Sequence, residues 1–387
     1  MRQWPKIALG DVLCRSSEPA VCMPDAEYDE VTIRLWGKGV ISRGKVRGAD
    51  VTTPRRVVRA NQLILSKIDA RNGAIGLVPQ ELDGAIVSND FPSFEFADSR
   101  QLDPAFMGWM VRSRHFVDLC KAASEGTTNR VRIKEDRFLA QQIVLPPLAE
   151  QQAVVCRLDT LAEKVRQVNE HLDAIERDSL RLLVTMATRK DISDAERHAL
   201  GWRETTISSI AELALHPQKV DAVESYPNIG IYSFARGLFE KPPIDGATTS
   251  AKILYRIKRG QFIYSRLFAF EGAYALVPQE FDGHFVSNEF PTFDVDPERA
   301  SAKLLMALFL TEADWYGLRA SSKGVGDRRL RIQPEHILAR KIWLPPRPEQ
   351  SRVERIYDLH FELKARHATI RQANDALIPA TLERVFN

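Results

Sequence analysis

Hydrophobic and polar positions divide this chain into two stretches of short runs, each followed by a long segment with a helical repeat. The runs ANQLILSKI at 60–68 and RGQFIYSRL at 259–267 have the apolar and aromatic content of β-strands. The runs FMGWMVRSRHFVDLCKAA at 106–123 and KLLMALFLTEADWYGLRA at 303–320 have helical spacing. We therefore expect strands and helices in both stretches, with the helices packed on a sheet.

The first long segment follows Leu145 and two prolines, and it contains neither Pro nor Gly until Gly201. Proline suits the first turn of a helix, and Glu150 suits the positive end of the helix dipole. A helix over 147–190 would be on the order of 60 Å long at 1.5 Å per residue. Its apolar residues recur at alternating spacings of three and four, which predicts a heptad seam. The seam members are Leu158, Leu161, Val165, Val168, Leu172, Ile175, Leu182 and Met186, with Ser179 as the polar one.

The second long segment, 347–387, repeats this arrangement less regularly. Its expected seam members are Val353, Ile356, Leu359, Leu363, Ile370 and Leu377. A single helix would leave such a stripe in water, so we expect the two helices to pack against each other as an antiparallel coiled coil. The alternative is an ordinary amphipathic helix that lies on its own domain.

Four sequence motifs occur twice at one offset of 199 residues. LVPQELDG at 77–84 returns as LVPQEFDG at 276–283, and SNDFPSF at 88–94 returns as SNEFPTF at 287–293. RVRI returns as RLRI, and LPPLAEQ returns as LPPRPEQ. Repeats of 20–50 residues build solenoids, whereas a period this long predicts two copies of a domain.

The pattern therefore predicts an α+β protein with two tandem globular domains, each followed by a long helix. We expect the first domain at 1–146 and its helix at 147–190. The second domain follows at 191–344, opening with a short linker at 191–201, and the second helix occupies 345–387.

Basic residues concentrate in three segments, although the chain carries 54 Lys+Arg against 51 Asp+Glu overall. One segment is 43–59, and the other two, 121–134 and 319–331, occupy equivalent places in the two copies. Arg and Lys supply phosphate contacts, while Arg, Asn, Ser and Thr reach base edges. A solvated surface also carries basic runs, but the equivalent places favour nucleic-acid binding. Candidate DNA contacts, including the equivalent ends of two strand-like runs at 67 and 266, are Arg43, Lys45, Arg47, Arg55, Arg56, Lys67, Thr127, Thr128, Asn129, Arg130, Arg132, Arg266, Ser321, Ser322, Lys323, Arg328, Arg329 and Arg331.

The composition, 44% hydrophobic and 27% charged, is typical of a soluble globular protein. The four cysteines show no close pairing of the kind that a zinc site needs, and we expect them to be reduced. No apolar run suits a signal peptide or a membrane span. The sequence therefore predicts a cytoplasmic protein that does not contact a membrane.

Motifs for catalysis are near-misses or are missing from the sequence. GVISRGKV at 39–46 nearly matches a phosphate-binding loop, but Val46 stands where a hydroxyl must hold Mg²⁺. We find no nucleophile elbow, no GxGxxG unit and no Asn-Pro-Pro-aromatic tetrapeptide. His367 and Asn374 fall near the second seam, where a polar residue more often fixes register than binds metal. We expect a binding protein with no catalytic residues, metal site or cofactor of its own.

The sequence resembles the specificity (S) subunits of Type I restriction-modification systems over nearly its whole length. The most specific elements are LPPLAEQQAVVCRLDTLAEKV at 145–165 and LPPRPEQSRVERIYDLHFEL at 344–363, which are similar to the segments that open the family's two long helices. The resemblance implies two target-recognition domains held apart by an antiparallel helix pair, each domain reading one half of a split DNA site. The second long helix of this chain has a weaker heptad seam than the resemblance would lead one to expect.

The resemblance also implies partners for the chain. The helices would act as a ruler and as a docking surface for methyltransferase (M) subunits, and a restriction (R) subunit would join the assembly. S-adenosylmethionine, ATP and Mg²⁺ are then expected only in those partners. On the first helix, the charged residues expected to contact a partner are Asp159, Glu163, Arg166 and Glu170.

Base contacts are expected where the two copies differ, namely at 51–59 and 249–258 and at 127–129 and 325–327. Shared residues are expected to hold the fold or the phosphates. Three alternatives stay open: an orphan specificity protein or scaffold of another defence system, a methyltransferase or nuclease with a divergent site, and a protein-binding coiled-coil adaptor.

Overall fold

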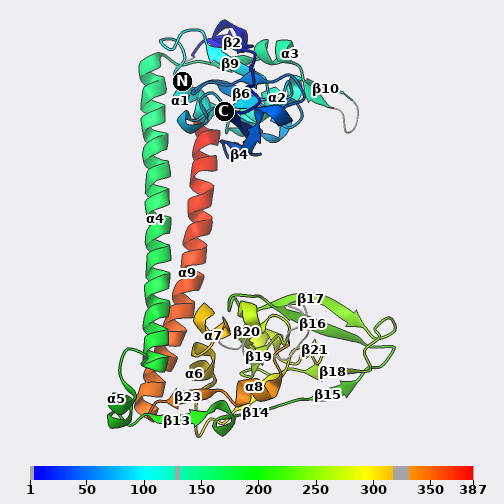
Figure 1. Cartoon of the computed structure of the whole chain (residues 1–387), viewed down its shortest axis with the longest axis vertical. Coiled ribbons are helices and arrows are strands. Elements are labelled where there is room, and N and C mark those ends of the chain that lie inside the picture. The colour runs from blue at the N-terminus through cyan, green and yellow to red at the C-terminus, as the bar shows by residue number, and fades with distance from the viewer. Residues whose placement is uncertain (1–3, 127–130, 317–330, 387) are drawn as a thin grey trace. The chain divides into compact units, whose positions relative to one another are not determined.

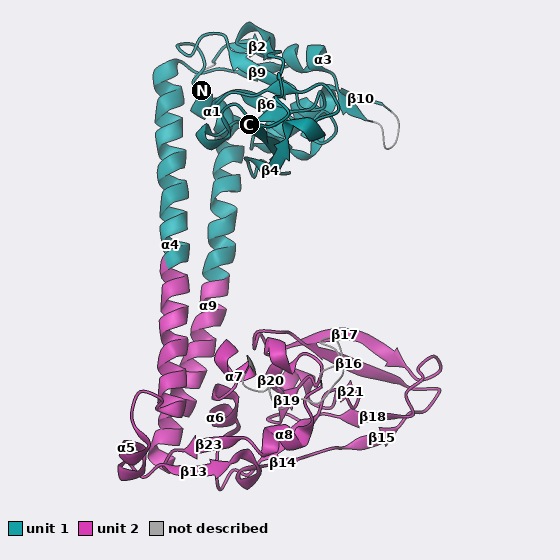
Figure 2. Cartoon of the chain, in the orientation of Figure 1, with its two compact units in different colours: residues 1–170, 369–387 teal, residues 171–368 magenta. Residues whose placement is uncertain are grey.

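The computed structural model describes residues 4–126, 131–316 and 331–386, and it divides into two compact units. Unit 1 comprises Met1–Glu170 and Thr369–Asn387, and unit 2 comprises His171–Ala368 (Figure 2). Each unit contains one globular copy and a part of both long helices. The four-part division expected from the sequence stays a prediction.

Unit 1 is built on two four-stranded sheets, ordered β2-β9-β6-β7 and β4-β3-β8-β5. Strands β2, β9 and β6 of the first sheet and β4 of the second are labelled in Figure 1. Its strands are β1 (Lys6–Ala8), β2 (Leu13–Ser16), β3 (Glu27–Ile33), β4 (Val40–Arg47), β5 (Arg56–Val57), β6 (Leu63–Leu65), β7 (Ile75–Leu77), β8 (Ile86–Val87), β9 (Ser93–Phe96), β10 (Ser124–Glu125), β11 (Arg132–Ile133) and β12 (Gln142–Val144). Its helices are α1 (Pro104–Met110), α2 (Arg114–Ala122), α3 (Glu135–Leu139) and the first part of α4 (Leu148–Thr188), with the 3-10 turn η3 (Ala70–Asn72).

Unit 2 repeats this design with a four-stranded sheet, β14-β22-β19-β20, and a five-stranded sheet, β15-β18-β21-β16-β17. Its strands are β13 (Arg203–Thr206), β14 (Ala211–Leu213), β15 (Pro217–Lys219), β16 (Ser225–Ile231), β17 (Leu238–Asp245), β18 (Ile253–Arg256), β19 (Phe262–Tyr264), β20 (Tyr274–Leu276), β21 (Phe285–Val286), β22 (Thr292–Val295) and β23 (Lys341–Leu344). Its helices are α5 (Asp194–Ala199), α6 (Ala302–Ala307), α7 (Glu312–Tyr316), α8 (Pro334–Leu338) and the first part of α9 (Arg347–Phe386).

Equivalent core strands of the two copies pair in the same register, which confirms the domain duplication at the level of the fold. Leu63 of β6 pairs with Phe94 of β9, and the equivalent Phe262 of β19 pairs with Phe293 of β22. All four side chains are fully buried in the core of their unit. The strand-like runs at 60–68 and 259–267 contain β6 and β19, as expected.

The helical region expected at 106–123 is two short helices, α1 and α2. Ser113 separates them because its hydroxyl accepts a hydrogen bond from the Phe116 N–H (3.2 Å) and so caps α2. In unit 2 the region expected at 303–320 likewise contains α6 and α7, and 317–320 lie outside the described residues.

A buried glutamine joins the start of each long helix to its own globular part. The Gln151 amide donates to the carbonyl oxygens of Gln101 (2.7 Å) and Pro146 (2.8 Å). The equivalent Gln350 donates to the carbonyl oxygens of Arg299 (3.2 Å) and Pro345 (3.0 Å). The repeated LPP motif with its final glutamine is therefore structural.

The long helices α4 and α9 pair antiparallel, as the sequence predicts. In unit 1, Leu158 of α4 packs in one cluster with Leu382 of α9, and the amide of Asn374 donates to Asn169 (3.0 Å). In unit 2, Glu176 lies 2.9 Å from His367. Ser179 lies 2.8 Å from His360, so numbers rise along one helix while they fall along the other.

The predicted seam membership is wrong for several positions of both helices. On α4, Val168, Ile175 and Leu182 are exposed by 40%, 47% and 51%, whereas Leu183 is fully buried. On α9 the expected Leu359, Ile370 and Leu377 are exposed. Among the described residues of α9, the expected Val353 is buried, together with Gln350, Tyr357, His360, His367 and Leu382. The observed seam includes polar residues that bond across the helix pair, so a search for apolar residues alone selected a neighbouring stripe.

Candidate nucleic-acid interface

Each unit carries a basic corner, defined as Lys67, Asp90 and Arg132 in unit 1 and their equivalents Arg266, Glu289 and Arg331 in unit 2. In unit 1, Arg132 Nη1 lies 2.8 Å from Asp90 Oδ1. Lys67 follows β6, and its ammonium lies 2.8 Å from Glu135 Oε1. The Lys67 N–H donates to the Asp90 carbonyl (2.8 Å), and the Lys67 carbonyl accepts from the Ile133 N–H (2.8 Å).

Unit 2 repeats the arginine–acid pair and both backbone hydrogen bonds of the basic corner, but not the ion pair of Lys67 with Glu135, because Pro334 stands at the position of Glu135. Arg331 Nε lies 2.9 Å from Glu289 Oε2, and the Arg266 N–H donates to the Glu289 carbonyl (2.9 Å). The Ile332 N–H donates to the Arg266 carbonyl (3.0 Å), as Ile133 does in unit 1. The acid in the repeated SN-Asp/Glu-FP motif and the second Arg of the RVRI or RLRI motif are therefore partners, which the sequence analysis missed. Their common offset of 199 residues was the available signal.

The acidic partner orients each arginine without using all of its donors. A guanidinium has five N–H donors, and the side chains of Arg132 and Arg331 are 50% and 42% exposed. A surface ion pair contributes only about 0–1 kcal/mol, so a phosphate can compete with the carboxylate. The basic corners can thus hold anions at two equivalent places.

Some predicted contacts lie outside the described residues. They are Thr127, Thr128, Asn129, Arg130, Ser321, Ser322, Lys323, Arg328 and Arg329. Their part in DNA binding stays a prediction. Arg132 is the second described residue after 127–130, and Arg331 is the first described residue after 317–330.

Three further candidates lie on β4, an edge strand of its sheet. Arg43, Lys45 and Arg47 are all exposed. Lys45 is 4.0 Å from Glu27, while Arg43 and Arg47 have no ion pair within the part of the chain that the structure describes. Arg43 faces a register shift between Glu30 and Val31, so it is the extra residue of a β-bulge. Because Arg43 and Arg47 lie on an edge strand and their charges are not paired with an acid of the described residues, they suit contact with a phosphate backbone.

Arg55 and Arg56 differ in their access to a ligand. Arg55 Nη2 is 3.0 Å from Glu30 Oε1, and its side chain is 20% exposed, so its charge is largely used within the unit. Arg56 is half-buried on β5, where it pairs with Val87. Within segment 51–59, neither residue is as accessible as those of β4.

The four predicted partner-binding residues are exposed on α4, but their charges already have partners in unit 1. Asp159 accepts a hydrogen bond from Trp109 Nε1 (2.8 Å). Arg166 pairs with Glu163 at 2.6 Å and also with Glu170. The hydrogen bond from Arg166, with a second from Gln167, lowers the pKa of Glu163 to about 2. Their role in binding a partner stays a prediction.

An apolar stripe on the long helices is about as exposed as these charges. Ile175 and Leu182 of α4 lie one heptad apart and are about half exposed, and Leu359 of α9 is 54% exposed. A water-exposed stripe at this spacing is typical of a helix face that another helix covers. The sequence analysis identified these residues but assigned them to the wrong seam.

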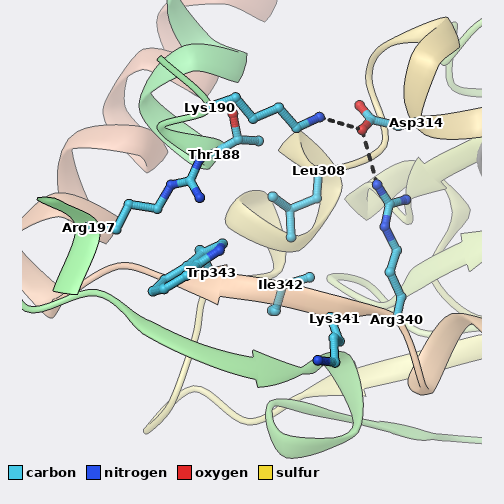
Figure 3. Close-up of a pocket in the computed structure, with 9 residues that line it drawn as sticks. All are labelled: Thr188, Lys190, Arg197, Leu308, Asp314, Arg340, Lys341, Ile342 and Trp343. Atoms are coloured by element: carbon cyan, nitrogen blue, oxygen red, sulfur yellow. Dashed lines mark hydrogen bonds and ion pairs between the residues drawn. The ribbon is translucent and has the colours of Figure 1, made fainter. Parts of the chain in front are cut away.

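A cationic pocket of about 200 Å³ in unit 2 is a second candidate site (Figure 3). Lys190 and Arg340 point at Asp314, with distances of 3.2 and 3.0 Å to Oδ1. Arg197 and Lys341 also line the pocket, but each has an acid elsewhere, Asp194 at 2.5 Å and Glu204 at 3.1 Å. The pair of Lys190 with Asp314 joins the segment after α4 to the globular part, which is a structural role.

The described residues contain no group of three or more His, Cys, Asp or Glu side chains placed to hold a metal ion. Within the same residues, no helix has the length and apolar character needed to cross a membrane.

Comparisons with known proteins extend these observations. No protein-family model matches the chain, and a search of curated proteins finds no match. The solved HsdS subunit from Thermoanaerobacter tengcongensis is 19% identical, covers 100% of this chain and 97% of its own, and has a TM-score of 0.55. A chain from a structure on complex assembly and conformational transition of the type I R-M system is 18% identical. It covers 100% of this chain and 98% of its own, with a TM-score of 0.66.

The chain therefore has an α+β fold of two tandem globular copies, each followed by a long helix. More particularly, this is the fold of Type I restriction-modification specificity subunits, which confirms the predicted resemblance at the level of the fold.

Proposed function

We propose that this chain is the DNA-specificity subunit of a Type I restriction-modification complex and catalyses no reaction itself. The observation that carries the proposal is the basic corner, which recurs with the same contacts in two similar but non-identical globular copies. Two such copies on paired helices suit a bipartite, asymmetric DNA site, one half-site to each copy. The fold shared with HsdS subunits supports this proposal.

The basic residues divide into two roles in this proposal. Arg132 and Arg331, with Arg266 and the β4 cations, contact phosphates and position the protein. Lys67 is 25% exposed and its charge is paired with Glu135, so in this proposal it holds the corner together. The segments that differ between the copies, 51–59 and 249–258, and 127–129 and 325–327, read base edges. Phosphate contacts contribute affinity for any duplex, while base contacts select the site.

Methyltransferase subunits are the proposed partners of the helix pair, and a restriction subunit joins the assembly. We place the M-subunit contact on the exposed apolar stripe of α4 and α9, next to the charged residues Asp159, Glu163, Arg166 and Glu170. S-adenosylmethionine, ATP and Mg²⁺ belong to those partners in this proposal, and the complex acts in the cytoplasm. The alternative, an orphan specificity protein or a scaffold of another defence system, would share the DNA site and lack these partner enzymes.

Selection from a random duplex pool tests the proposed function directly. The full chain, mixed with an M subunit from the same host, is expected to enrich two short conserved blocks separated by a fixed gap. Enrichment of a single uninterrupted block, or of none, contradicts the proposal. Calorimetry of the chain alone with S-adenosylmethionine separates the methyltransferase alternative, for which heat of binding is expected.

A further inference from the structure

The tip of one hairpin in each unit presents an exposed aromatic side chain. Trp36 lies between β3 and β4, and Phe234 lies between β16 and β17; they are 68% and 57% exposed. Their backbone φ angles are 61° and 64°, in the left-handed region that bulky residues rarely adopt. We call residues 34–39 and 232–237 the aromatic hairpins.

The same two backbone hydrogen bonds hold both hairpin tips in this conformation. Trp36 N–H donates to the Asn72 carbonyl (3.0 Å), and Phe234 N–H donates to the Glu271 carbonyl (2.7 Å). In each unit the next residue of the hairpin donates to the carbonyl of the glycine that comes after the first acceptor. These bonds run from Gly37 to Gly73 (2.9 Å) in unit 1 and from Ala235 to Gly272 (2.7 Å) in unit 2. Strained conformations persist where the surroundings determine them, often at ligand sites.

Each aromatic hairpin is cationic as well as aromatic. Arg34 and Lys38 flank Trp36, and neither has an ion pair among the described residues. In unit 2, Arg236 lies over the rings of Tyr232 (5.1 Å) and Phe234 (5.9 Å), and it too lacks an acidic partner there. An exposed aromatic ring beside a cation that has no acidic partner complements a ligand that carries both phosphate groups and flat, partly apolar surfaces.

The aromatic hairpin and the basic corner are joined by one short segment in each unit. Lys67 belongs to the basic corner, and Asn72, five residues later, holds the backbone of Trp36. Five Cα–Cα steps span on the order of 20 Å at most, or about six base pairs of duplex. A single half-site can therefore reach both features.

We propose that the aromatic hairpins are a second DNA contact in each unit, in which Trp36 or Phe234 packs against the sugar or base surface of a groove and Lys38 or Arg236 pairs with a phosphate. This inference rests on the proposed function. Apolar wedges of this kind enter the minor groove in several architectural proteins. A hollow of about 420 Å³ beside Lys38 in unit 1 and one of about 300 Å³ beside Arg236 in unit 2 are what a protein partner would use instead.

Fluorescence anisotropy of a labelled 40-base-pair duplex of mixed sequence, titrated with the full chain, tests the hairpin contact. Trp36→Ala and Phe234→Ala are each expected to weaken binding about five- to tenfold. Lys38→Gln and Arg236→Gln are expected to lower the salt dependence of log K by about one each. Val21→Ala and Val223→Ala replace exposed apolar residues of the same units (80% and 89% exposed) and are expected to leave binding unchanged.

Thermal unfolding checks that each variant is folded, and the lysine and arginine variants keep the test valid if an aromatic variant unfolds. Unchanged affinity and salt dependence in all four variants, with the parent chain binding normally, overturns the hairpin contact alone. Lost capture of a purified M subunit at unchanged DNA affinity also overturns it, in favour of protein docking. A parent chain that binds no duplex overturns both this inference and the proposed function.

Discussion

At the scale of single residues, the repeated motifs correspond to side chains that hold each copy together and orient its cations. Asp90 and Glu289 fix the second arginine of the RVRI and RLRI motifs. Gln151 and Gln350 fix the start of each long helix. Repetition along the chain therefore marks contacts that hold both copies together. The guanidinium N–H groups that do not bond to the acid remain available to a ligand.

The basic corner predicts opposite effects for its acid and its arginine. Arg132→Gln removes a cation that faces phosphate, so duplex binding is expected to weaken and the slope of log K against log salt to fall by about one. Asp90→Asn removes the competing carboxylate and is expected to strengthen binding. Anisotropy titrations at several salt concentrations measure both. A weaker Asp90→Asn complex, with the fold intact, would show that the ion pair itself is needed.

His360 predicts how the helix pair responds to acid. Burial lowers the pKa of His360, Lys364 acts in the same direction, and Glu176 opposes them. Because the folded-state pKa lies below the unfolded value of about 6.5, protonation favours unfolding. Stability from this residue is complete above about pH 6.5 and is lost as the pH falls through the folded pKa.

Denaturant titrations between pH 7.5 and 5 measure this effect. His360→Gln is expected to reduce the loss of stability on acidification, while His171→Gln, an exposed residue of α4, is expected to leave it unchanged. Equal pH dependence in the parent chain and His360→Gln would exclude His360 as a source of acid sensitivity.

At the scale of elements, the long helices could be predicted from sequence but their contact face could not. The absence of Pro and Gly over 148–200 and the recurring apolar residues were sufficient for α4. The contact face was misassigned because polar pairs such as Asn169 with Asn374 and Glu176 with His367 occupy it. A polar residue in a seam is acceptable when its partner lies opposite, and that partner is some 200 residues away in the chain.

Adjacent leucines of α4 test the observed seam. Leu183 is fully buried in unit 2, whereas Leu182 is 51% exposed. Leu183→Ala is expected to destabilise the fold by about 2–5 kcal/mol because it leaves a cavity. Leu182→Ala is expected to change stability by less than about 1 kcal/mol. Urea unfolding of the two variants compares them directly, and the reverse order would restore the seam predicted from the sequence.

At the scale of the whole molecule, the duplication was evident from four motifs at one offset. The sequence also located Lys67, Arg132, Arg266 and Arg331, because basic residues at equivalent places are visible without a structure. It could not identify the aromatic hairpins, since a single Trp or Phe is unremarkable until its exposure and its backbone conformation are known. Long-range contacts determine those properties.

Mapping methylated adenines in the host genome tests most directly whether two globular copies read two half-sites. The parent chain, expressed with its M subunit, is expected to direct methylation to one gapped, asymmetric sequence. Replacing 51–59 with a different sequence is expected to change one half of that sequence and to leave the other half and the gap unaltered. Methylation at an ungapped motif, or a replacement that alters both halves together, would contradict recognition by two separate copies.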